Sequence, residues 1–159
     1  LLTGKLAGAE VRGIQSQNMA ATVKHFACNN KETNRKHSDS RLSQRALREI
    51  YLRAFEIIVR EAKPWAIMSS YNVVNGRRAS ESRELLTSIL RDEWGYTGLV
   101  MSDWWTRGEQ YKELLAGNDL KMANGYPERV EEAMKLGAVS RSDLEICAKR
   151  VLEFILRID

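Results

Sequence analysis

The sequence predicts an α/β fold made of βα units with parallel strands, of the kind that closes into a (β/α)₈ barrel. Short apolar runs alternate with longer stretches whose apolar residues recur at helical spacing, which is typical of βα units. Polar or charged residues gather where three successive predicted strands end. The glycine-rich fingerprints of dinucleotide-binding and P-loop sheets do not occur, and this favours a barrel over an open sheet.

The first half of the chain contains two predicted helices and two predicted strands. A helix is expected over residues 2–17, and a short run over residues 20–26 is expected to form a strand. The next helix begins at Ser43, a good N-cap, and continues with apolar residues at i, i+3 and i+4 until Pro64 stops it. Residues 65–69 then form the second strand, so this half provides the first βα repeats.

The second half repeats the alternation. A helix opens at Ser80 or Ser82 and closes at Gly95, since glycine is common just after a helix. A buried strand over residues 99–102 follows. The remaining elements are a helix over residues 109–116, a weak strand over 118–122, and helices over 128–136 and 142–158, the last of them amphipathic. About four βα units are therefore expected.

Composition sets limits on the class of protein. The chain has 159 residues, 43% of them hydrophobic, and a net charge of +4, which suits one globular domain with a packed core. No apolar run approaches the roughly 20 residues of a membrane span, and the small, dispersed charge argues against nucleic-acid binding. Cys28 and Cys147 are expected to be small buried hydrophobes. No signal-peptide pattern is found, and the location of the protein stays open.

Asp103 is the most informative acid in the sequence. It ends the predicted strand over residues 99–102 and precedes Trp104 and Trp105. A carboxylate in this position is a candidate nucleophile or base, and a neighbouring indole offers a flat apolar platform for the C–H face of a sugar. The structural alternative is an aspartate that caps the next helix.

Other polar residues at strand ends are candidates for binding a substrate. Lys24 and His25 offer donors to hydroxyls or to an anion, and Arg35 adds a planar fork. Tyr71 and Asn72 follow the strand over residues 65–69 and are placed to orient a ligand. Each of these residues has a structural alternative as a solvated or internally satisfied side chain.

Two further residues are interpreted as structural. Asp119 fits a turn or a helix-orienting role, and His37 lies in a polar loop and is expected to be exposed.

A metal site is the competing constellation. His25, Asp103, Asp119 and Glu32 offer nitrogen and oxygen ligands, but no pair shows His-x-x-x-His spacing. We therefore predict no metal and no cofactor. A serine hydrolase is disfavoured because no Gly-x-Ser-x-Gly elbow occurs.

Four segments, in order and across nearly the whole chain, resemble glycoside hydrolase family 3. They are residues 24–35 (KHFACNNKETNR), residues 68–76 (MSSYNVVNG), residues 98–104 (GLVMSDW) and residues 116–122 (AGNDLKM). The resemblance implies that residues 1–159 are the C-terminal half of that family's TIM-type (β/α)₈ barrel domain. The family's first barrel strands and its second α/β domain would then lie outside this segment.

The resemblance also implies a role for each candidate residue. Asp103 would be the nucleophile of a retaining β-glycosidase that hydrolyses nonreducing-end β-linked sugars through a glycosyl-enzyme intermediate. The residues around the sugar would be Lys24, His25, Arg35, Tyr71 and Trp104. Ala27-Cys28 stands where the N-acetylhexosaminidase branch usually has Pro-Gly, so the β-glucosidase or β-xylosidase branch is favoured.

Part of the family's machinery has no counterpart in this sequence. The acid/base glutamate usually comes from the second domain, and neither Glu32 nor Glu109 lies in a motif that matches it. Two hypotheses follow. The chain is part of a retaining β-glycosidase that acts on a β-linked oligosaccharide or glycoside in the complete protein, or it is a catalytically inactive sugar-binding or scaffold fragment when isolated.

Overall fold

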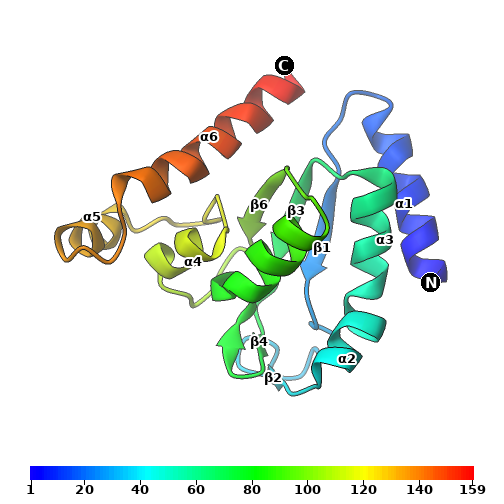
Figure 1. Cartoon of the computed structure of the whole chain (residues 1–159), viewed down its shortest axis with the longest axis horizontal. Helices are drawn as coiled ribbons and strands as arrows, with labels where there is room; N and C mark the ends of the chain where they lie inside the picture. The colour runs from blue at the N-terminus through cyan, green and yellow to red at the C-terminus, as the bar shows by residue number, and fades with distance from the viewer.

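The computed structural model describes all 159 residues and has a parallel sheet at its centre. Strands β1 (Thr22–Phe26), β3 (Ala66–Ser69) and β6 (Leu99–Ser102) lie side by side in the order β1-β3-β6 (Figure 1). The predicted strand over residues 118–122 is reduced to one parallel bridge between Met101 and Leu120. The predicted α/β fold with parallel strands is confirmed, and the fourth strand is its weakest part.

The helices of the first half cover one side of this sheet. Helix α1 (Leu2–Gln15) packs against α3 (Arg53–Ala62), beside β1 in Figure 1. The helix predicted from Ser43 is divided into α2 (Gln44–Ala46), the π-helical η1 (Leu47–Tyr51) and α3. The Ser43 hydroxyl accepts a hydrogen bond from the Ala46 N–H at 3.2 Å, which confirms the predicted cap.

The helices of the second half follow β3 and β6. The short η2 (Ala79–Glu81) leads into η3 (Glu84–Glu93). Near the start of η3 the Leu85 N–H donates to the Ser82 hydroxyl at 3.3 Å, whereas the Ser80 hydroxyl donates to Glu113. Gly95 has a φ of +71°, as expected for a residue just after a helix. The last helices are α4 (Gln110–Ala116), α5 (Pro127–Lys135) and α6 (Arg141–Ile158).

A second, smaller sheet was not predicted. It consists of β2 (Asp39–Ser40), β4 (Val73–Val74) and β5 (Arg77–Arg78), in the order β2-β4-β5. Two residues per strand are too few to show an alternating hydrophobic pattern, so the sequence gives no signal for them. This sheet connects the loop after β1 to the loop after β3, and both loops carry candidate site residues.

The main core lies between the parallel sheet and the helices η1, α3 and η3. Phe26, Ile67 and Val100, one from each strand, are completely buried there. The ring of Phe26 meets the rings of Phe55 and Trp94 edge-on, at centroid distances of 5.1 and 6.0 Å.

Helix α6 differs from the rest of the fold in its packing. Its predicted apolar face is present in sequence, but only Cys147 is buried. The apolar side chains of Leu152 and Ile155 are 60% and 44% exposed. In Figure 1 this helix extends from α5 toward the C-terminus along one side of the molecule. None of the helices combines the length and apolar composition that crossing a bilayer requires.

Candidate functional site

Asp103 lies directly after β6 and is 7% exposed. Its backbone N–H donates to the carbonyl of Ser69 at 3.1 Å, which continues the β3–β6 ladder. One carboxylate oxygen, Oδ1, accepts a hydrogen bond from the Trp104 N–H at 2.7 Å. Helix α4 has Glu109 as its N-cap, so Asp103 does not serve as the helix cap that was the structural alternative.

His25 comes from β1 and faces the other oxygen of this carboxylate. Its Nε2 lies 3.5 Å from Oδ2 of Asp103. Burial lowers the pKa of His25, and Asp103 opposes this shift, while the charges of Lys24 and Arg35 add to it. The neutral imidazole is therefore the favoured form at neutral pH.

Tyr71 and Arg35 complete the group around Asp103. Tyr71 follows β3 and is 4% exposed, and burial together with the Asp103 carboxylate raises the pKa of its hydroxyl. The Arg35 guanidinium lies 5.2 Å from the Tyr71 ring centroid, within cation–π range. Asp103, His25, Tyr71 and Arg35 thus bring an acid, a neutral imidazole, a phenol and a cation to one place.

Lys24 and Trp104 lie at the edges of this group. Lys24 is exposed, and together with His25 it lines a hollow of about 690 Å³ between β1, α1 and η1. Trp104 reaches the Asp103 carboxylate through its backbone N–H, and the residue is 43% exposed. Both residues are exposed, and neither side chain makes a hydrogen bond or an ion pair with the Asp103 carboxylate.

The prediction missed one residue of the site, Lys36. The Lys36 Nζ lies 5.7 Å from the Tyr71 ring centroid and 5.3 Å from the Trp105 ring centroid, so it joins the two aromatic side chains. Lys36 was overlooked because it belongs to a polar loop, and its only signal was its place next to Arg35.

Asp119 connects two helices to the strand that precedes Asp103, whereas a turn or helix-orienting role was predicted for it. Its side chain is completely buried, and Oδ2 accepts from the Val100 N–H at 2.9 Å and from Arg91 at 2.7 Å. Arg150 binds Oδ1 at 3.0 Å. The start of β6 is therefore fixed to η3 and α6 by one carboxylate.

The set considered for a metal is not assembled. No group of three or more histidine, cysteine or acidic side chains is arranged to hold a metal ion. The Asp119 carboxylate is engaged by Arg91 and Arg150, and that of Glu32 pairs with Arg35 at 3.3 Å. His37 is exposed, and Cys28 and Cys147 are free and buried, as predicted.

Comparison with known proteins gives a consistent result. The family model described as the glycosyl hydrolase family 3 N-terminal domain matches residues 1–154. Beta-glucosidase A of Butyrivibrio fibrisolvens is 65% identical over 144 residues, covering 91% of this chain and 17% of that protein. An exo-alpha-(1->6)-L-arabinopyranosidase of Bifidobacterium longum is 43% identical over 155 residues, covering 97% of this chain and 20% of that protein.

Solved structures agree. Beta-glucosidase 3B of Thermotoga neapolitana, solved with glucose, aligns with a TM-score of 0.93 and 43% identity, covering 97% of this chain and 23% of that one. The beta-glucosidase of Kluyveromyces marxianus, also solved with glucose, aligns with a TM-score of 0.94 and 37% identity. This alignment covers 98% of this chain and 19% of that one. The TIM-barrel-type fold is confirmed, and the chain spans about a fifth of the length of these relatives.

Proposed function

The chain belongs to glycosyl hydrolase family 3, and we propose that it supplies the nucleophile and part of the sugar subsite of a retaining, β-glucosidase-like glycosidase. The observation that carries this proposal is the Asp103 carboxylate. It is nearly buried at the carboxyl end of β6, with one oxygen held by a backbone N–H and the other facing His25. Active sites of barrel enzymes form at this end of the strands.

The proposed reaction has two steps with balanced proton transfers. An oxygen of ionised Asp103 attacks the anomeric carbon, and the glycosidic C–O bond breaks as a second carboxyl group protonates the leaving oxygen. Water then attacks the glycosyl ester, gives its proton to that second carboxylate, and releases the sugar and free Asp103.

The surroundings of Asp103 suit this role. The Trp104 N–H holds Oδ1 in place, and the neutral His25 imidazole does not form a fixed charge pair with Oδ2 that would weaken the nucleophile. The Tyr71 hydroxyl keeps its proton because its pKa is raised, and it is available as a hydrogen-bond donor beside the reacting oxygens.

The proposed sugar subsite uses the side chains around this centre. Lys24, His25 and Arg35 provide donors for ring hydroxyls, and Trp104 provides an exposed apolar face at the rim. The nonreducing-end sugar of a β-linked oligosaccharide or glycoside would lie across these side chains.

We further propose that the complete protein supplies the remaining parts. In the sheet order β1-β3-β6, strand β1 has one unpaired edge, and β6 is followed only by the Leu120 bridge. Such edges are normally covered or paired. Additional barrel strands would pair with them, and the acid/base glutamate would come from a second α/β domain. Glu32 and Glu109 pair instead with Arg35 and Arg129.

A 2-fluoro-glucoside inactivator tests the nucleophile in the complete protein. Peptide mass spectrometry is expected to find the label on Asp103, and a label on any other residue would overturn the assignment. Because one relative is named an arabinopyranosidase, aryl α-L-arabinopyranoside should be assayed beside aryl β-glucoside and β-xyloside. Turnover by residues 1–159 alone would rule out the alternative of a fragment that is inactive when isolated.

A further inference from the structure

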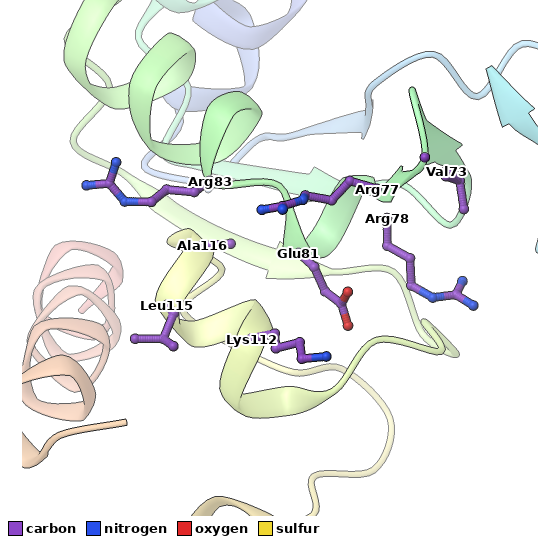
Figure 2. A pocket seen from close by; sticks show the side chains of 9 residues that line it. Val73, Arg77, Arg78, Glu81, Arg83, Lys112, Leu115 and Ala116 are labelled. Carbon is purple, nitrogen blue, oxygen red and sulfur yellow. The ribbon is translucent and has the colours of Figure 1, made fainter. Parts of the chain in front are cut away.

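A second hollow carries positive charge that the site around Asp103 does not use. It lies between the β4–β5 hairpin and α4 and has a volume of about 610 Å³, within the range of small-molecule sites. Figure 2 shows Arg77, Arg78 and Arg83 on one wall and Lys112 on the facing helix. Glu81 is the only acid among the lining residues.

The four cations of this hollow have no carboxylate partners. None of them takes part in an ion pair, although arginines elsewhere, such as Arg48 with Glu93, do. Glu81 is already engaged, because its Oε1 accepts the Glu109 N–H at 2.7 Å. The hollow therefore has an uncompensated positive charge.

Arg78 provides a more specific sign. Its Nη1 is buried and has no hydrogen-bond partner. A buried donor without an acceptor costs about 1–3 kcal/mol, and more when the group is charged. Such groups are rare in folded proteins unless a ligand or water satisfies them. Arg78 lines the hollow, so this unpaired donor belongs to one of its walls.

We propose that this hollow binds a phosphate group, either as inorganic phosphate or as part of a small phosphomonoester. A phosphate group carries about −1.5 to −2 charges near neutral pH. Four cations face one carboxylate, that of Glu81, so a phosphate balances the remaining positive charge better than a ligand with one carboxylate would. The planar fork of an arginine suits phosphate oxygens in a bidentate contact. This inference does not depend on the glycosidase activity.

A ligand in this hollow would connect two segments that follow different strands of the central sheet. The β4–β5 hairpin follows Asn72 and returns to it, since the Ala79 N–H donates to the Asn72 carbonyl at 3.0 Å. Helix α4 follows the segment that begins at Asp103. A phosphate that contacts both walls would tie together the segments after β3 and β6 and stabilise the folded protein.

Calorimetric titration of the complete protein tests the proposal. Inorganic phosphate and glucose 6-phosphate are titrated separately at one ionic strength kept with sodium chloride, because salt screens exposed charges. We expect saturable one-to-one binding, weakened about tenfold or more by the Arg77→Gln/Arg78→Gln double variant, as charge-assisted hydrogen bonds imply. The Arg12→Gln variant removes one charge from the exposed face of α1 and is expected to leave binding unchanged.

Each outcome decides the question. Binding of inorganic phosphate alone, or tighter binding of the ester that the double variant also weakens, supports the site and identifies which source of phosphate it takes. Binding of the ester that the double variant leaves unchanged would be binding elsewhere and would count against the site. Heats equal to those of chloride, or equal weakening by Arg12→Gln, would overturn it, as would a structure of the complete protein with an acidic segment filling the hollow. If the double variant does not fold, Lys112→Gln decides, because Lys112 is exposed on α4 and its loss leaves the core intact.

Discussion

His25 and Asp103 meet across an intervening strand. They come from β1 and β6, which both pair with β3, yet the imidazole Nε2 lies 3.5 Å from the carboxylate Oδ2. Strands two places apart in a sheet are separated by about 9–10 Å, so both side chains must lean over the end of β3 to meet. This convergence is what joins three strand ends into one site.

The first prediction concerns the protonation of His25. Its pKa is lowered from 6.5, chiefly by burial, so its NMR titration midpoint is expected below 6.5. The neutral form is the one the fold favours. The contribution of neutral His25 to the stability of the fold is therefore present above pH 6.5. This contribution is lost as the pH falls through the lowered pKa, because the folded protein must then protonate a buried imidazole.

Changing Asp103 tests how far its carboxylate opposes this lowering of the His25 pKa. Asp103 raises the pKa of His25, so Asp103→Asn is expected to lower the NMR midpoint further. Glu32 raises it less, so Glu32→Gln serves as a control with a smaller effect in the same direction. A midpoint that rises in Asp103→Asn would show that the carboxylate does not face the imidazole as described.

The second prediction concerns turnover. Under the proposed function, Asp103→Asn keeps the shape of the side chain but removes the attacking oxygen's charge, and kcat on an aryl β-glucoside should fall by about 10³-fold or more. KM should change far less, since the sugar contacts remain. Asp92→Asn is the control, because Asp92 is an exposed carboxylate on η3. Equal turnover in the wild type and Asp103→Asn would refute the assigned role.

The sequence predicted the regular parts of the fold well. The strands over residues 65–69 and 99–102 and the helix cap at Ser43 were predicted nearly as they occur, because each has a clear apolar run or capping side chain. The β4 and β5 strands were missed, since two-residue strands have no periodicity. The hydrophobic spacing also does not show whether residues 47–51 form a π-helix, as η1 does, or an α-helix.

The site was only partly accessible to sequence reasoning. Asp103 and Tyr71 stand out because each follows a buried strand. Lys36 was missed because its aromatic partners, Tyr71 and Trp105, lie far away in sequence. The buried ion pair of Glu113 and Lys121 was also missed, since charged side chains are mostly exposed and nothing in the sequence marks these two as buried. Nothing in the sequence near Arg78 indicates that the hairpin and α4 enclose a common hollow.

The third prediction concerns the two thiols. Burial raises the pKa of Cys28 and Cys147 to about 11. At pH 8 each is then about a thousandfold more thiol than thiolate, and the thiolate is the reactive form. Both should react slowly with Ellman's reagent in the folded protein and rapidly in urea. Fast reaction of either in the folded state would contradict the packing around it.

The fourth prediction compares two glycines. A Cβ added at Gly98, just before β6, would lie 2.5 Å from the Tyr96 hydroxyl and 2.6 Å from the Trp65 carbonyl oxygen. Gly98→Ala must therefore displace backbone, and it should destabilise the protein by about 1–3 kcal/mol. Gly13→Ala is the matched control, since a Cβ there meets nothing within 4 Å on α1.

The control variant Gly13→Ala is expected to change the free energy of unfolding in the opposite direction. Alanine is favoured over glycine inside a helix by about 0.5–1 kcal/mol, so Gly13→Ala should raise the free energy of unfolding measured in urea. If both variants change stability by the same amount in the same direction, the close contact at Gly98 does not determine the outcome.

The fifth prediction concerns the ion pair between Glu113 and Lys121. The side chains are 1% and 5% exposed, and Lys121 Nζ lies 2.8 Å from Glu113 Oε2. Lys121 also donates to the Thr106 and Gly108 carbonyls, so the pair fixes the loop that follows Asp103. Lys121→Met leaves a buried carboxylate without its cation and should cost about 3–5 kcal/mol in urea unfolding.

A double-variant cycle separates the pair from the burial of each residue. Glu113→Gln combined with Lys121→Met leaves no unpaired charge, so the double variant should be less destabilised than the sum of the single variants. The exposed pair of Lys149 and Glu153, 3.7 Å apart, is the comparison, and its removal should cost only about 0–1 kcal/mol. Additive losses at Glu113 and Lys121 would mean that the two charges do not compensate each other, and that the loop after Asp103 is held by its other contacts.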